Sequence, residues 1–161
     1  MEDGNNINRY SAGELLFATK ASEIYSAVDN EVESRAMVLV RSRFPLEEGS
    51  KVALDQRLSD FANNSTFLPK AVLSGLDVRS HLYVIFETAA RTPITLFSDD
   101  ATVKERLFVK LVSEVARLHE KNIILADLAG ENVLVSSDEE LSFLGVLGGF
   151  DACLLYTSPS P

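Results

Sequence analysis

The sequence has no tryptophan, a single cysteine and only two histidines, so several kinds of site are excluded at the outset. One cysteine cannot form an internal disulfide, and together with two histidines it cannot complete a cysteine and histidine metal centre. No apolar run approaches the roughly 18–20 residues that cross a bilayer. Residues 1–14 also lack the basic and then apolar order of a secretory signal. We therefore expect a cytoplasmic protein that does not contact a membrane.

Basic residues are scarce as well. Lysine and arginine total 15 against 24 acidic residues, which gives a net charge of −9 and leaves no basic field to attract nucleic acid. Hydrophobic residues make up 46% of the chain, and 161 residues are enough to bury the core of one ordinary domain. We expect a globular protein without nucleic-acid partners.

What the sequence does contain is an ordered series of strand and helix patterns. Continuous or alternating apolar runs predict strands, and apolar residues three or four positions apart predict helices. In chain order, they predict a hairpin (15–17 and 24–28), a strand (36–40), a helix (about 50–64), two strands (67–76 and 81–87), a long helix (103–118) and two short strands (132–135 and 141–144). This order predicts an α+β fold.

The two ends of the chain differ from its middle. Residues 1–9 are polar, and we expect them to be disordered. Residues 153–161 break from the preceding pattern, and Leu154 to Pro161 resemble translated sequencing-adapter read-through; a natural Ser/Pro tail is the alternative. If the read-through interpretation holds, the natural product continues beyond this chain. Residues 10–152 are then the folded part.

A more specific signal lies in the loop that follows the long helix. Asp127 and Asn132 have the D-x-x-x-x-N spacing of a phosphoryl-transfer loop, and Asn132 leads into the apolar run Val133-Leu134-Val135. With Leu118-His119 before it, this run resembles the eukaryotic-type protein kinase family in a degenerate form. An active member has His-Arg-Asp where this chain has Leu125-Ala126-Asp127, and a lysine where it has Ala129.

The resemblance implies a particular version of the α+β fold. Residues 10–88 are expected to form a small lobe, an antiparallel sheet plus one helix. Residues 89–152 are expected to form the first helix and the catalytic hairpin of a large lobe, cut off after the region of the D-F-G motif. Phe86 and Glu87 would enter the hinge between the lobes. Asp127 would be the vestigial catalytic base and Asn132 a metal ligand, although both side chains also suit a purely structural role in a loop.

The parts that bind nucleotide in this family are degraded. The positions of the glycine-rich loop are held by Phe17, Thr19 and Ser22, so no glycine allows close backbone approach to phosphate. Arg41 takes the position of the strand lysine, with Arg43 or a gapped alignment as alternatives. Gln56 takes the position of its helix glutamate. An arginine keeps the charge but fits phosphate differently from an ammonium group.

The metal-binding D-F-G motif also has no clear counterpart. An ungapped alignment places Gly145-Val146-Leu147 there, and a shift of three residues places Gly148-Gly149-Phe150 there, neither of which contains a carboxylate. Only a longer shift makes Asp151 the Mg²⁺ ligand. The resemblance therefore implies no cofactor, or weakly bound ATP with Mg²⁺.

Three interpretations of function follow. The first is a catalytically impaired, pseudokinase-like domain that acts through a protein partner, such as an active kinase or a substrate, by scaffolding or allosteric control. The alternative is a divergent active Ser/Thr-type protein kinase that uses Asp127, Asn132, Asp151 and Arg41. The third is that the chain as written has no function alone, because it lacks the helices that would cover the apolar side of the 103–118 helix. That exposed side predicts poor soluble expression.

Overall fold

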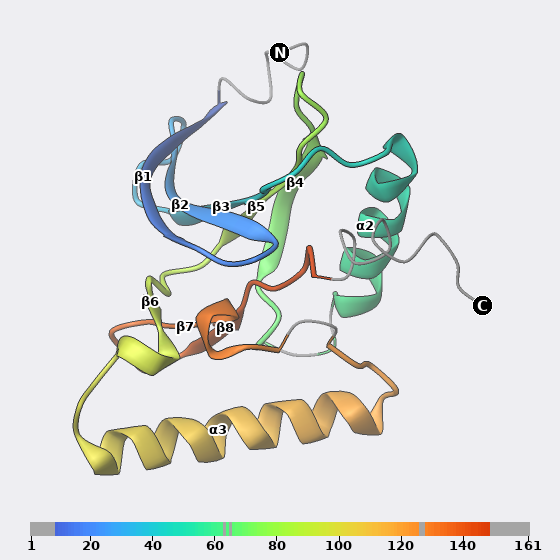
Figure 1. The fold of residues 1–161 in the computed structure, drawn as a ribbon. Coiled ribbons are helices and arrows are strands. Elements are labelled where there is room, and N and C mark those ends of the chain that lie inside the picture. The colour runs from blue at the N-terminus through green and yellow to red at the C-terminus, as the bar shows by residue number, and fades with distance from the viewer. Residues whose placement is uncertain (1–8, 63, 65, 126–127, 149–161) are drawn as a thin grey trace.

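The computed structural model describes residues 9–62, 64, 66–125 and 128–148 (Figure 1). Within these residues the protein is an α+β fold with a five-stranded antiparallel sheet, a three-stranded antiparallel sheet and two α-helices, which confirms the predicted class. None of the helices in this part of the chain is long and apolar enough to span a membrane. The expected disordered segment and tail lie outside the described residues, apart from Arg9.

The larger sheet forms the upper half of the molecule in Figure 1. Its strand order is β1-β2-β3-β5-β4, and every neighbouring pair is antiparallel. The strands are β1 (Tyr10–Ala18), β2 (Ser22–Asp29), β3 (Ala36–Ser42), β4 (Lys70–Leu76) and β5 (Leu82–Glu87). All five were predicted by the apolar patterns, with β1 longer than expected. Because β1 and β4 each have one neighbour, they are the two edges of the sheet.

Helix α2 (Glu48–Phe61) connects β3 to β4 and lies against the sheet (Figure 1). Its anchor is Leu54, which is fully buried, and Leu58 and Phe61 pack against the same core. These residues are three or four positions apart, as on one face of a helix. The helix begins two residues before the predicted start and ends three residues before the predicted end.

The lower half is built around a long helix and a small sheet. Helix α3 (Ala101–Glu120) is capped by Asp100, whose carboxylate accepts hydrogen bonds from the backbone N–H groups of Thr102 and Val103. The sheet has the order β6-β7-β8, with β6 (Thr92–Pro93), β7 (Val133–Val135) and β8 (Leu141–Phe143). The sequence did not predict β6, nor the 3₁₀ helices η1 (Ile94–Leu96) and η2 (Gly130–Asn132), because elements this short show no periodicity.

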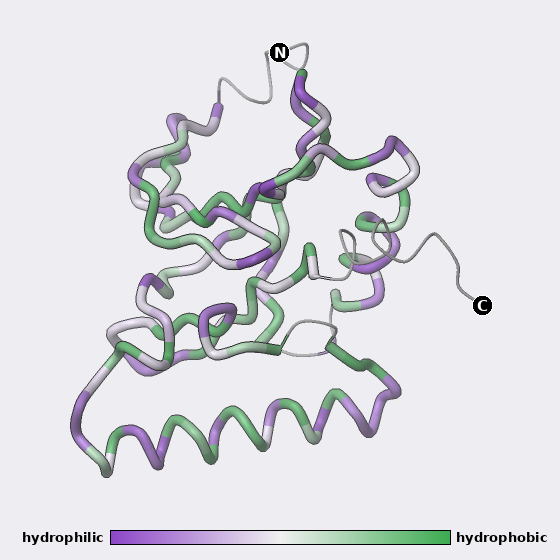
Figure 2. The backbone as a smooth tube through the Cα atoms, viewed as in Figure 1, coloured by the Kyte–Doolittle hydropathy of each residue, from purple (hydrophilic) through white to green (hydrophobic). Residues whose placement is uncertain are grey.

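The apolar stripe of α3 that predicted the helix is covered in part. Leu107 and Leu118 are buried, and Val103, Leu111 and Val115 pack against the same core. Figure 2 shows hydrophobic and hydrophilic residues alternating along the helix, as expected for an amphipathic helix. A second group of apolar side chains, Phe108, Val109 and Val112, remains exposed. These three do not belong to the stripe that predicted the helix.

The two faces of the larger sheet pack differently, because neighbouring residues of a strand point to opposite sides. The inner face, which includes Ile24, Val38 and Val40, joins α2, α3 and the hairpin β7–β8 in one large core. The outer face has a small core of Ala27, Met37 and Ile85. The inner face is therefore the side that meets the lower half of the molecule.

A buried carboxylate ties the N-terminal end of β1 to the sheet. The side chain of Asp29 is 0% exposed, and its oxygens accept hydrogen bonds from Arg9 (3.0 Å twice) and from Arg35 (3.0 Å). The N–H groups of Glu31 and Val32 also donate to it. Because Arg9 is held in this way, the ordered part of the chain includes a residue that the sequence placed in the polar N-terminal segment.

We expect Asp29→Asn to make the free energy of unfolding less dependent on pH in the acidic range. The hydrogen bond from Arg9 holds the pKa of Asp29 well below its usual range, and this outweighs burial, which acts in the opposite direction. A depressed pKa stabilises the fold above the unfolded value of about 3.9, and this contribution is lost as the pH falls from there towards the folded value. The stability difference between wild type and variant should therefore be constant above about pH 5 and shrink below about pH 4.

The measurement is urea unfolding of the two proteins across that pH range. Glu33→Gln is the matched control, because Glu33 lies in the same turn but is exposed. A stability difference between wild type and the Asp29→Asn variant that is the same at neutral and acidic pH would contradict the prediction.

Candidate functional site

The region where the two halves of the molecule meet is the site that the sequence singled out. On the upper side are the inner faces of β2 and β3, and on the lower side are η2, β7 and the segment after β8. Ile24, Val38 and Val40 are 0% exposed and belong to the same core as Leu144 and Leu147. Side chains of the chain itself therefore fill this interface.

The turn between β1 and β2 occupies the position of the expected glycine-rich loop. Thr19, which is buried, uses its hydroxyl oxygen to accept hydrogen bonds from the N–H groups of Ala21 (3.3 Å) and Ser22 (3.0 Å). Its own N–H donates to the carbonyl of Ser22 (2.8 Å). The N–H groups of Thr19, Ala21 and Ser22 are thus already used inside the turn.

Strand β3 places Arg41 on the outer face of the sheet. Its guanidinium contacts Asp77 (2.9 Å) and lies 3.6 Å from Glu23, and the same face carries Leu39 and Met37. The alternative Arg43 is exposed and donates to the carbonyl of Thr19 (3.1 Å). Val40, the residue before Arg41 on β3, points to the inner face of the sheet. The strand therefore brings an apolar side chain, and neither arginine, towards the lower half of the molecule.

Helix α2 directs Arg57, and not Gln56, towards the interface. Gln56 is exposed and donates to Asp60 (3.0 Å). Arg57 is half-buried and donates from one guanidinium nitrogen to the carbonyl oxygens of Val146 (2.6 Å) and Gly148 (2.7 Å). Arg41 and Gln56 are therefore not brought together. The sequence contains one signal for Arg57 that the prediction missed. Arg57 lies three residues after Leu54 and four before Phe61, so it is on the face of α2 that packs against the core.

The segment after β8 rises between the larger sheet and α2, as Figure 1 shows in red. Val146 and Leu147 are buried, and Leu147 lies beside Ala21, Ser42 and Leu46. The ungapped alignment placed the D-F-G motif on Gly145-Val146-Leu147. In the structure these residues supply apolar packing under the β1–β2 turn and carbonyl groups for Arg57.

Asn132 is buried at the end of η2, next to the same segment. Its N–H donates to the carbonyl of Ala129 (2.9 Å), and its carbonyl accepts from the N–H of Leu144 (2.8 Å). The backbone of Asn132 therefore connects the loop to the hairpin. Asp127 and Asp151, the other two predicted site carboxylates, lie outside the described residues. In the part of the chain that the structure describes, no three Asp, Glu, His or Cys side chains are grouped so as to hold a metal ion.

The predicted hinge residues lie at the end of β5. Phe86 points into the core and is buried, whereas Glu87 is on the outer face and accepts two hydrogen bonds from Arg35 (3.1 Å each). The linker that follows is fixed by Arg91, which donates to the carbonyl oxygens of Thr88 (2.7 Å), Ala90 (2.9 Å) and Met37 (3.0 Å). Burial lowers the pKa of Arg91 from its usual value.

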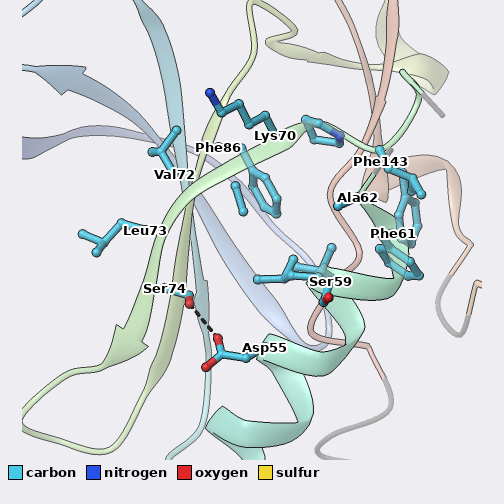
Figure 3. Close-up of a pocket in the computed structure, with 15 residues that line it drawn as sticks. Asp55, Ser59, Phe61, Ala62, Lys70, Val72, Leu73, Ser74, Phe86 and Phe143 are labelled. Carbon is cyan, nitrogen blue, oxygen red and sulfur yellow. Dashed lines mark hydrogen bonds between the residues drawn. The ribbon is translucent and has the colours of Figure 1, made fainter. Parts of the chain in front are cut away.

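A groove with a volume of about 780 Å³ lies on the other side of α2, between this helix and β4 (Figure 3). Its walls are mostly apolar, with Phe61 and Phe143 at one end and Phe86 at the back. Asp55, Ser59, Lys70 and Ser74 are its polar side chains. Figure 3 shows the hydrogen bond between Ser74 and Asp55 (2.9 Å), which joins the strand to the helix across the groove. The sequence reading did not identify this groove.

These features decide which chemistry the described residues support. Three N–H groups of the turn are used, the inner face of β3 is apolar, and Leu147 belongs to the core that lies below it. Among the described residues, no cation of β3 faces the interface, and the β1–β2 turn uses the N–H groups of Thr19, Ala21 and Ser22 internally. By contrast, the groove beside β4 is open and apolar, as binding sites for other molecules are.

Searches against models of known protein families and against curated proteins found no match for this chain.

Proposed function

We propose that this chain is a degenerate, protein kinase-like domain that binds a protein partner and does not transfer phosphate. The proposal combines the resemblance carried by the Asp127 to Asn132 spacing with the architecture. Three strands, a helix and two strands are followed by a linker, a long helix and a hairpin. The resemblance implies this order for a small lobe and the beginning of a large lobe.

The observation that supports the proposed loss of catalysis is the packed interface between the two halves of the molecule. Phosphoryl transfer depends on preorganised donors and metal ions aimed at the phosphates. Here the corresponding positions contain Thr19, which closes its own turn, and Val40 and Leu147, which pack against other apolar groups. Each missing electrostatic contact costs several kcal/mol of transition-state stabilisation, so that the combined loss leaves negligible turnover. What remains is a folded domain with surfaces that can bind another protein.

The test is a thermal melt of the full chain with and without Mg-ATP, combined with a phosphate-transfer assay on general protein substrates. A nucleotide with a Kd of about 100 μM, present at about 1 mM, would stabilise the fold by ~1.4 kcal/mol. For a protein of this size that corresponds to a rise in Tm of about 3–6 °C. We expect no rise and no transfer.

The control is Asp127→Asn, which removes the one side chain that could act as a base in an active kinase. Transfer by the wild-type chain that is lost in this variant would overturn the proposal and establish the divergent active kinase. A rise in Tm without transfer would overturn the claim that nucleotide does not fit, and would leave the protein-binding function.

A further inference from the structure

We draw no further inference here: the strongest candidate, the patch of exposed apolar side chains Phe108, Val109 and Val112 on helix α3, carries none, because nothing in the structure shows what covers it.

Discussion

Leu147→Ala is expected to lower the free energy of unfolding by about 3 kcal/mol, within the range of ~2–5 kcal/mol for buried leucines. Leu147 is 1% exposed and lies under the β1–β2 turn, beside Ala21, Ser42 and Leu46. Its truncation removes apolar contacts from both halves of the molecule at once. Because a packed core does not collapse fully, most of the volume remains as a cavity. Urea unfolding followed by circular dichroism measures the change.

The matched control is Leu96→Ala. Leu96 is 74% exposed, so its truncation should change stability by no more than about 0.5 kcal/mol. Leu147→Met, which nearly conserves volume, should cost less than about 1.5 kcal/mol. If Leu147→Ala were as mild as the Leu96 control, Leu147 would not be a packed element of the interface.

The same variant separates two reasons why the proposed domain would not bind nucleotide. If Leu147 acted only as a plug, its removal would make room for a nucleotide, and Mg-ATP would then raise the Tm. We expect no such rise, because the donors of Ala21 and Ser22 remain bound to Thr19 and β3 still presents Val40. In the proposed function, the missing donors and cation, more than the filled volume, account for the loss of phosphate binding.

Arg57→Ala is expected to lower the free energy of unfolding by about 2 kcal/mol. Hydrogen bonds from a charged donor are worth ~1.5–3 kcal/mol, and the variant also leaves two carbonyl groups, of Val146 and Gly148, without this donor. The effect should also be local. Hydrogen exchange should become faster in the segment after β8, because Arg57 is the contact that fastens this segment to α2.

Gln56→Ala is the control on the same helix, since Gln56 is exposed and its side chain donates a hydrogen bond to the neighbouring Asp60. Its expected effect is within ~0.5 kcal/mol. The loss of unfolding free energy in Arg57→Lys should fall between those of Arg57→Ala and Gln56→Ala. A lysine keeps the positive charge, but its ammonium group lacks the planar fork of the guanidinium and is expected to reach one of the two carbonyl groups. Loss of stability without faster exchange at residues 144–148 would contradict the proposed fastening role.

Leu147 and Arg57 act on the same short segment, so their effects should not add. In the double variant, the loss is expected to be smaller than the sum of the single losses by about 0.5 kcal/mol or more. This coupling would show that apolar packing and the arginine contact hold a single element. Simple additivity would mean that the two residues stabilise separate parts of the interface.

The elements of the fold were largely predictable, and particular residues show why. The spacing of Val103, Leu107, Leu111, Val115 and Leu118 predicted α3, and the structure shows Asp100 as its cap. The unbroken run Leu82–Phe86 predicted β5, which the structure buries. Such patterns are local, because they arise from the period of a helix or strand and from capping within a few residues.

The candidate site was much less predictable. Arg41 and Val40 are neighbours, and a shift of one residue along a strand moves a side chain to the opposite face of the sheet. Gln56 and Arg57 are also neighbours, and one residue along a helix turns the side chain by about 100°. When a motif is degraded, its alignment to a sequence is uncertain by about one residue, which is enough to select the wrong one of two neighbours. The groove between α2 and β4 had no sequence signal, since its walls come from segments that are distant in the chain.

The sequence by itself determined the α+β class and the order of the strands and helices. These properties depend on composition and on local periodicity, which every stretch of chain carries in itself. Only the tertiary structure decided that Val40 and not Arg41 faces the interface, that Arg57 reaches the segment after β8, and that the edge of β4 borders an open groove. The physical reason is that the direction of a side chain matters only relative to what packs against it, and those partners come from elsewhere in the sequence.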